Sequence, residues 1–278
     1  MTALLNWLSQ IGSITKLSLL TVFERKGASA AAAFGIAGVV AVLVGVLSIA
    51  QGFRAAMVAS GSPDTALVLR GGADSEMMSL LLGSETRVIT DAPEIAASAA
   101  RPLASAELFV IINLPKRSTG TDANVPLRGV QPAAYQVRDG FELLEGRRFE
   151  TGRYEVIVGR GAAAEFAGLE VGAKIRMGRN DWTVVGVFAD RGGLSESEIW
   201  TDARLLQSAY QRGNSYQSVC VKLNSPERFD AFKDALAADP RINVKVVRQT
   251  EYYAEQSVAI YNLRSEEHTS ELQSRSDL

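Results

Sequence analysis

The sequence predicts an α+β protein: an N-terminal transmembrane helix followed by a mixed α/β domain that contains a β-α-β unit and a β-rich subdomain. Three observations support this fold class. Residues 28–50 contain no charged side chain, and residues 107–188 hold several apolar segments bounded by turn residues. Residues 218–247 have the pattern of strand, helix and strand.

Residues 28–50 are long enough to cross a membrane as a helix. At a rise of about 1.5 Å per residue they reach about 35 Å, against about 30 Å for the hydrocarbon core of a bilayer. Charged residues lie just outside the run, with Arg25 and Lys26 before it and Arg54 after it. A core helix of a globular domain is usually shorter and has a polar face. We therefore predict a transmembrane helix over residues 28–51.

The segment before this helix is rich in leucine and isoleucine, but polar residues interrupt it too often for burial in lipid. We predict that residues 1–27 form a cytoplasmic amphipathic helix on the membrane face. A cleaved signal peptide is the alternative. It fits less well, because the apolar run beyond Lys26 is too long and no cleavage site follows it, so a signal anchor is the better description.

The basic residues predict the orientation of the chain. Lys16, Arg25 and Lys26 precede the apolar run, whereas Arg54 alone follows it closely. The positive-inside rule then places the N-terminus in the cytoplasm and the residues from 52 onward outside it.

Small residues recur every four positions within the apolar run, which would let a second helix approach closely. The candidate helix-packing residues are Ser29, Ala33, Ala37, Ala41 and Gly45. The alternative is that alanine is merely common in membrane helices.

After the helix, Gly61-Ser62-Pro63 is expected to end the helical conformation, and residues 66–69 are expected to form the first strand of the domain. We predict a second strand at residues 87–90. Asp91 then caps a short helix, with Pro93 in its first turn.

Two apolar segments, residues 107–114 and 125–130, predict an extended hairpin around the polar loop 116–124. A further strand is expected at residues 154–158. It leads into Gly159-Arg160-Gly161-Ala162-Ala163-Ala164, which matches the dinucleotide fingerprint G-x-G-x-x-A.

The residues that follow argue against a nucleotide site. The helix after the glycines runs only to about Gly168, and residues 173–177 and 182–188 predict a hairpin. No parallel crossover and no acidic residue at the end of a second parallel strand are expected, so nucleotide binding is disfavoured.

The last third predicts a helix from a Thr201 cap to about Gln211, then a strand at 218–223. A helix over 225–239 follows, with Pro226 at its first position and Asp239-Pro240 at its end. Residues 244–247 form the returning strand. A new helix begins near Thr250 and becomes apolar at residues 258–260.

The sequence contains few residues that could form a catalytic, cofactor-binding or metal-binding site. Cys220 is the only cysteine and is expected to be buried, and Glu196 and Glu198 are expected on the solvated surface. No basic cluster suggests nucleic acid, and the formal net charge is −2. We therefore predict no catalytic, cofactor-binding or metal-binding residues, no cofactor, no nucleic-acid partner and no enzymatic activity.

The last residues differ in character from the rest. Residues 264–274 resemble the translation of a common short-read sequencing adapter, so residues 264–278 are interpreted as an artefactual tail. The only histidine, His268, lies in this tail. We expect the natural gene to continue differently after Leu263.

Five segments, in this order and spacing, resemble MacB/FtsX-type ABC transporter permeases. They are LRGVQP (127–132), LEGRRF (144–149), EVIVG (155–159), LEVGAKI (169–175) and WTVVGVF (182–188). The resemblance covers roughly residues 18–263. It implies that residues 52–263 are a MacB-like periplasmic core domain between the first two of four spans, and that this chain stops before the second span.

The resemblance also implies a function and partners. The chain would be a permease subunit in the inner membrane, coupling ATP hydrolysis by an ABC ATPase subunit to extracytoplasmic motion for export or lipoprotein release. The implied partners are that ATPase, membrane lipid, a second permease in a homo- or heterodimer, and a periplasmic adaptor or lipoprotein. The alternative is a single-span anchored binding or scaffold module. A membrane-tethered enzyme is disfavoured by the missing histidine.

Overall fold

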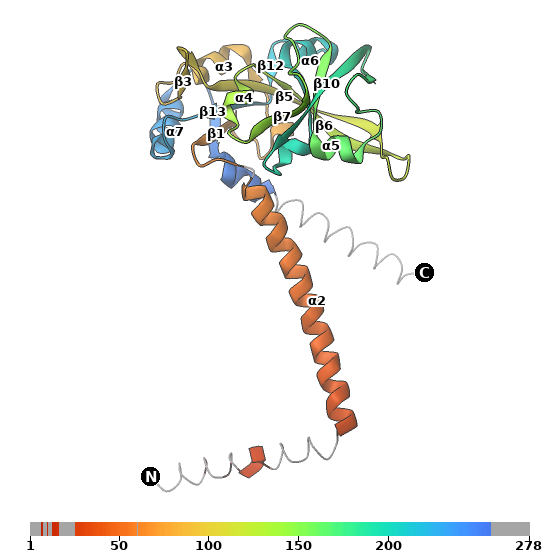
Figure 1. Ribbon diagram of the computed structural model, residues 1–278. Coiled ribbons are helices and arrows are strands. Elements are labelled where there is room, and N and C mark those ends of the chain that lie inside the picture. Colours follow the sequence, from red (N-terminus) through yellow and green to blue (C-terminus); the bar gives the residue numbers. More distant parts are fainter. Residues whose placement is uncertain (1–6, 8–9, 11–12, 17–25, 60, 257–278) are drawn as a thin grey trace, which may run out of the picture. The chain divides into compact units, whose positions relative to one another are not determined.

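The computed structural model describes residues 7, 10, 13–16, 26–59 and 61–256 (Figure 1). It divides into two compact units, Met1–Gly52 and Phe53–Leu278, called unit 1 and unit 2 below. The amphipathic helix predicted for residues 1–27 lies mostly outside the described residues, although Trp7, Gln10 and residues 13–16 are helical and exposed. The apolar turn at 258–260 and the tail at 264–278 lie outside them entirely.

The predicted transmembrane helix lies within α2, Lys26–Ala59, a helix of 34 residues. In the part of the chain that the structure describes, it is the one helix long and apolar enough to cross a membrane. Its apolar window is Lys26–Ile49, with a mean hydropathy of 2.5. The helix ends before Gly61, as predicted. The large apolar side chains of the window are exposed, as lipid-facing side chains would be.

Unit 2 is built around a ten-stranded mixed sheet, which confirms the α+β class (Figure 1). Its strands in spatial order are β14 (Val244–Arg248), β1 (Thr65–Arg70), β13 (Ser218–Lys222), β5 (Ala104–Pro115), β6 (Asp122–Val130), β11 (Ile199–Asp202), β8 (Glu155–Gly159), β10 (Asn180–Asp190) and β7 (Phe141–Gly146), with β9 (Lys174–Met177) paired to β10. Two small sheets pair β12 (Ser215–Tyr216) with β2 (Leu81–Leu82), and β3 (Ala97–Ser98) with β4 (Arg101–Pro102).

Short helices cover this sheet. They are η1 (Glu76–Met78), α3 (Gly83–Thr90), α4 (Ala134–Val137), α5 (Arg160–Glu165), η2 (Leu194–Ser197), α6 (Ala203–Ala209), η3 (Pro226–Arg228) and α7 (Phe229–Ala238). Residues 249–256 are also helical. In Figure 1, α7 and α3 lie beside the β1–β13 end of the sheet, and α5 packs against β8 and β10.

The predicted β-α-β unit is present as β13-α7-β14. The two strands are parallel but not adjacent, because β1 lies between them and pairs antiparallel with both. Helix α7 buries Phe229, Phe232 and Leu236 in the core on this side of the sheet. These residues recur at helical spacing, which is why the sequence predicts this element well.

The long strand β5 joins the two halves of the sheet. Residues Ala104–Glu107 pair with β13, and from Leu108 onward the strand pairs with β6 in the predicted hairpin. The partner therefore changes between Glu107 and Leu108. This places Glu107 at the centre of the sheet, where its side chain is fully buried.

Two local predictions near the start of the domain are wrong. Residues 87–90 belong to α3, not to a strand, because Thr86 and Ile89 face the core at three-residue spacing. The Glu85 carboxylate accepts a hydrogen bond from the Leu82 N–H at 2.6 Å and so supports the helix start. Asp91 lies at the C-terminal end of α3 and does not cap a new helix.

Two further predictions need correction. Strand β10 pairs parallel with β8, so a parallel crossover does follow β8, with β9 inserted into it as the predicted hairpin. Helix α6 is capped by Asp202, whose carboxylate accepts the Arg204 N–H at 2.8 Å. Thr201 belongs to β11 instead. Cys220 is buried as expected, and its burial raises the pKa of the thiol to about 12.

Candidate functional site

Five charged side chains lie together in the interior of unit 2. They are Glu76, Glu107, Arg128, Arg138 and Glu198, called the Arg128 cluster below, and each residue is less than one tenth exposed. The expectation that Glu198 lies on the solvated surface is therefore wrong. Three carboxylates against two guanidinium groups leave a formal charge of −1. Such a group is tolerated inside a protein only where its members satisfy one another.

Arg128, on β6, holds the cluster together. Its guanidinium makes two hydrogen bonds to Glu198, both at 2.8 Å, and two to Glu76, at 2.7 and 3.1 Å. A further bond of 3.0 Å runs from Nη1 to Glu107. The guanidinium also lies 4.9 Å from the centre of the Phe109 ring. One side chain thus joins η1, β5, β6 and the segment before β11.

Arg138 completes the pairing of Glu107. Its Nη1 and Nη2 atoms each lie 2.8 Å from a carboxylate oxygen of Glu107. Burial by itself acts to raise the pKa of Glu107, but the guanidinium groups of Arg138 and Arg128 outweigh it. The pKa therefore lies below its usual value of 4.5, and Glu107 is ionised at neutral pH.

Polar groups around the cluster extend it to the last helical segment. The Trp200 indole N–H donates to Glu198 at 2.7 Å, and the Ser218 hydroxyl donates to Glu76 at 2.6 Å. The Glu76 N–H donates to the Tyr252 hydroxyl at 3.0 Å. Because Tyr252 lies in the helical residues 249–256, the cluster connects that segment to the middle of the sheet.

The ionised state of Glu107 predicts acid lability. A carboxyl group whose pKa is lowered in the folded state stabilises the fold above its usual pKa, and this stabilisation is lost as the pH falls through the folded value. We expect the urea midpoint of the full chain in detergent to be steady near neutral pH and to fall below about pH 4.5. Glu107→Gln is expected to have a lower midpoint at neutral pH and a weaker pH dependence below that. Equal slopes for the two proteins would contradict this assignment.

The chain enters and leaves the sheet of unit 2 at neighbouring points. Residues 61–63 lead into β1, and residues 248–250 are the last residue of β14 and the two that follow it; β14 is the strand hydrogen-bonded to β1 on this side. Together these six residues are called the leg junction below. A Cβ built on Gly61 would lie 2.8 Å from the Thr250 amide nitrogen, so the two backbones are in close contact.

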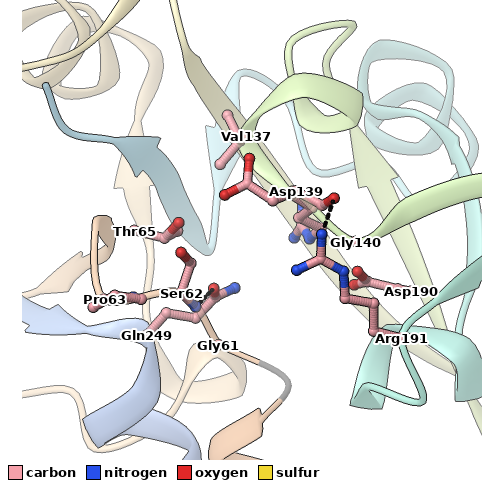
Figure 2. Close-up of a pocket in the computed structure, with 11 residues that line it drawn as sticks. Gly61, Ser62, Pro63, Thr65, Val137, Asp139, Gly140, Asp190, Arg191 and Gln249 are labelled. Atoms are coloured by element: carbon pink, nitrogen blue, oxygen red, sulfur yellow. Dashed lines mark hydrogen bonds between the residues drawn. The ribbon is translucent and has the colours of Figure 1, made fainter. Parts of the chain in front are cut away.

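A cavity of about 180 Å³ adjoins the leg junction (Figure 2). Figure 2 shows Ser62, Thr65 and Gln249 on one side of it, and Asp139 and Arg191 on the other. Its remaining lining residues are Gly61, Pro63, Val137, Arg138, Gly140 and Asp190. Two hydrogen bonds join lining residues: the Ser62 N–H donates to Gln249 Oε1 at 3.4 Å, and Arg191 donates to the Asp139 carbonyl at 3.3 Å. Within the described residues, no group of three or more histidine, cysteine or acidic residues is placed to hold a metal ion.

The glycines of the fingerprint G-x-G-x-x-A have a packing role. A Cβ on Gly159 would lie 2.2 Å from the Glu196 carbonyl oxygen, and one on Gly161 would lie 3.0 Å from the same atom. The Glu196 side chain is also buried, contrary to expectation. It accepts the N–H groups of Asp190 and Gly192 at 2.8 and 2.7 Å. The protein's own loop thus occupies the space in front of these glycines.

This packing predicts how the stability of unit 2 changes when a methyl group is added at Gly159 or Gly161. Gly159→Ala is expected to destabilise unit 2 by about 1–3 kcal/mol, because the Glu196 backbone must move. Gly161→Ala should cost less, since its Cβ meets the same carbonyl at a longer distance. Urea unfolding of the full chain, followed by tryptophan fluorescence, measures both. A neutral Gly159→Ala would refute the packing explanation.

The helix-packing candidates Ser29, Ala33, Ala37, Ala41 and Gly45 all lie on α2. On an α-helix, positions four apart form a ridge inclined at about 26° to the helix axis, not a line parallel to it. Ridges of this kind suit a crossing helix. Whether α2 packs on another helix through these residues stays a prediction.

The Arg128 cluster was missed at the sequence level. A signal for it exists, because Glu107 and Arg128 are charged residues within mainly apolar strand segments. A charge on the core face of a strand needs a buried partner of opposite sign. The identity of the partners could not be foreseen, because Glu76 and Glu198 reach Arg128 from η1 and from the segment before β11, both distant in sequence.

Residues 29–239 match the family model described as the MacB-like periplasmic core domain. The chain belongs to this family. The resemblance to MacB/FtsX-type permeases is thereby confirmed, and the chain carries the periplasmic core domain of an ABC transporter permease family. No curated protein sequence matches the chain.

One solved structure shares the fold of this MacB-like domain, and a second superposes with a lower TM-score. The periplasmic region of MacB from Actinobacillus actinomycetemcomitans superposes with a TM-score of 0.52 at 14% identity, over 73% of this chain and 95% of that one. The extracellular domain of the noncanonic ABC-type transporter YknZ from Gram-positive bacteria gives a TM-score of 0.49 at 14% identity, over 66% of this chain and all of that one. The first likeness supports the fold of unit 2.

Proposed function

We propose that this chain is part of a permease subunit that couples ATP hydrolysis on a separate ABC ATPase subunit to motion of its MacB-like domain. The subunit lies in the inner membrane, with its N-terminus in the cytoplasm and residues 52–263 on the periplasmic side. The motion serves export of a hydrophobic or amphipathic substrate, or release of a lipoprotein. Family membership and the apolar window of α2 support this proposal.

The observation that carries the proposal is the way the last helical segment is held. Residues 249–256 follow directly from β14. Tyr252 accepts a hydrogen bond from the backbone of Glu76, and the Glu76 carboxylate binds Arg128. Arg128 in turn binds Glu198 and Glu107. A displacement of this helical segment would therefore reach both halves of the sheet through buried ion pairs.

The partners follow from the same assignment. Ser29, Ala33, Ala37, Ala41 and Gly45 would pack against further membrane helices of the same permease or of a second permease in a dimer. The ATPase would act on the cytoplasmic side, and this chain would carry no catalytic residue. A periplasmic adaptor or lipoprotein would contact unit 2.

The test is to make the chain flexible directly after the helical residues 249–256 while leaving unit 2 itself unchanged. A flexible Gly/Ser segment inserted after Gln256 in the complete transporter should abolish ATP-dependent export while ATP hydrolysis continues. The matched control is the same insertion after Gly120, at the exposed tip of the β5–β6 hairpin, which should leave export intact. Unaltered export after the insertion at Gln256 would overturn the proposal.

A further inference from the structure

We propose that the leg junction is a clasp that holds the entering and leaving segments together, so that unit 2 moves as one rigid body and its two legs do not separate. The entering leg is residues 61–64 and the leaving leg is residues 249–256. The inference rests on the proposed function, and it specifies the motion that the domain transmits.

The two backbones of the clasp approach each other closely. The Gly61 Cβ position lies 2.8 Å from the Thr250 nitrogen and 3.0 Å from its Cα atom. A side chain at Gly61 would push directly against the backbone of the other leg. The backbone of Gly61 is not in the left-handed region, so close approach, not conformational freedom, explains the glycine here.

Hydrogen bonds on both sides secure this contact. The Ser62 N–H donates to the Gln249 amide oxygen at 3.4 Å, and the Gln249 Nε2 donates to the Tyr253 hydroxyl at 3.2 Å. Arg248 donates to the carbonyl of Pro63 at 3.0 Å while its guanidinium lies 4.2 Å from the centre of the Phe229 ring. The same guanidinium nitrogen lies 3.0 Å from the Pro226 carbonyl. Each leg is therefore bonded to the other and to the body of the domain.

The clasp is continuous with the sheet. Strands β1 and β14 pair from Ala66 opposite Arg248 to Arg70 opposite Val244. On its other edge, β1 pairs with β13 from Thr65 opposite Lys222 onward. Separating the legs would break the hydrogen bonds between β14 and β1, whereas tilting both legs together breaks none of the hydrogen bonds of β1 to β14 or β13. These contacts favour tilting over separation.

The leaving leg is also held farther along. Tyr252 accepts the Glu76 N–H, and the Gln256 side chain donates to the Asp74 carbonyl at 3.0 Å. Both partners belong to the loop between β1 and β2. The leg is thus fixed to unit 2 over its described length and cannot swing freely about Thr250.

A disulfide across the junction tests the clasp. The paired substitutions Ser62→Cys and Gln249→Cys place one thiol on each leg, at two residues that a hydrogen bond from the Ser62 backbone N–H to the Gln249 side chain already brings together, and Cys220 is left in place because it is buried. In the full chain in detergent, oxidation should give an intramolecular bond between residues 62 and 249, detected by mass spectrometry after proteolysis. If both thiols react with maleimide but no bond forms, the legs are not clasped and the inference is wrong.

The locked protein then tests the motion. In the complete transporter, ATP-dependent export should be the same within about twofold before and after reduction of the bond. Export that returns only on reduction would show that the legs must separate, and would overturn the inference. If the transporter without the cysteines shows no ATP-dependent export, the proposed function fails instead, and cross-linking still reports whether the clasp exists.

A second variant opens the clasp without cysteines. Gly61→Ala is expected to lower export several-fold because its methyl group meets the Thr250 backbone. Gly52→Ala is the matched control, since a Cβ there meets nothing within 4 Å. Equal export by the two variants would argue against a clasp.

Discussion

Replacement of Arg128 by methionine is expected to destabilise unit 2 by about 3–5 kcal/mol, the usual cost of breaking a buried ion pair from one side. The change removes the guanidinium that binds Glu76 and Glu198 and leaves Glu107 with Arg138 alone among the cluster's cations. Methionine fills a similar volume, so the loss is electrostatic and not a cavity. Urea unfolding of the full chain in detergent, followed by tryptophan fluorescence, measures it.

Two comparisons sharpen this experiment. Arg153→Met removes an arginine whose side chain is 63% exposed, and should change stability by less than about 0.5 kcal/mol. Arg128→Lys keeps the charge but cannot make paired hydrogen bonds to two carboxylates, so its stability should lie between those of the methionine variant and the parent. A loss below about 1 kcal/mol for Arg128→Met would mean that the cluster is not an essential part of the fold.

Replacement of Trp200 by alanine is expected to cost a similar amount, about 3–5 kcal/mol, for a different reason. Its indole ring is fully buried and lies 4.5 Å from the Phe188 ring and 5.9 Å from the Phe141 ring, centre to centre. The Arg138 guanidinium lies over it at 4.8 Å. Alanine leaves a large cavity there and also removes the indole donor from Glu198. The free energy of unfolding in urea is again the measurement.

The chain contains its own control for this change. Trp7 is 61% exposed and belongs to unit 1, so Trp7→Ala should leave the unfolding of unit 2 unchanged. Trp200→Phe should recover part of the loss, since a phenyl ring refills the cavity but cannot donate to Glu198. A phenylalanine variant as stable as the parent would show that the indole hydrogen bond contributes nothing.

The elements that the sequence predicts well are those whose pattern is local. The hairpin β5–β6 follows from two apolar segments, residues 107–114 and 125–130, on either side of a polar loop, and the helix α7 follows from the helical spacing of Phe229, Phe232 and Leu236. The helix α3 was mistaken for a strand because Val88, Ile89 and Thr90 are β-branched, and four residues are too few to separate the helical period from the strand period. In the structure, Thr86 and Ile89 are buried three positions apart, which is the period of a helix and not of a strand.

The contacts between residues far apart in the sequence were the hardest to predict from the sequence. No sequence pattern near β8 or β10 indicates that the two strands run parallel, since the β9 hairpin between them resembles a simple meander. The burial of Glu198 depends in the same way on Arg128, seventy positions away. The charges of the cluster are visible in the sequence, but the partner of each charge is set by the tertiary fold.

The change of partner along β5 bears on how unit 2 unfolds. Its apolar residues form separate clusters on either side of Glu107, one with β1, β13 and α7 and another with β6, β8 and β10. Two cores of this kind could melt independently. Because one continuous strand supplies a pairing edge to each, and Glu107 is held from both sides, loss of either core unpairs the other. Unit 2 is thus expected to unfold in a single cooperative transition, and a cut within β5 should leave neither half able to refold alone.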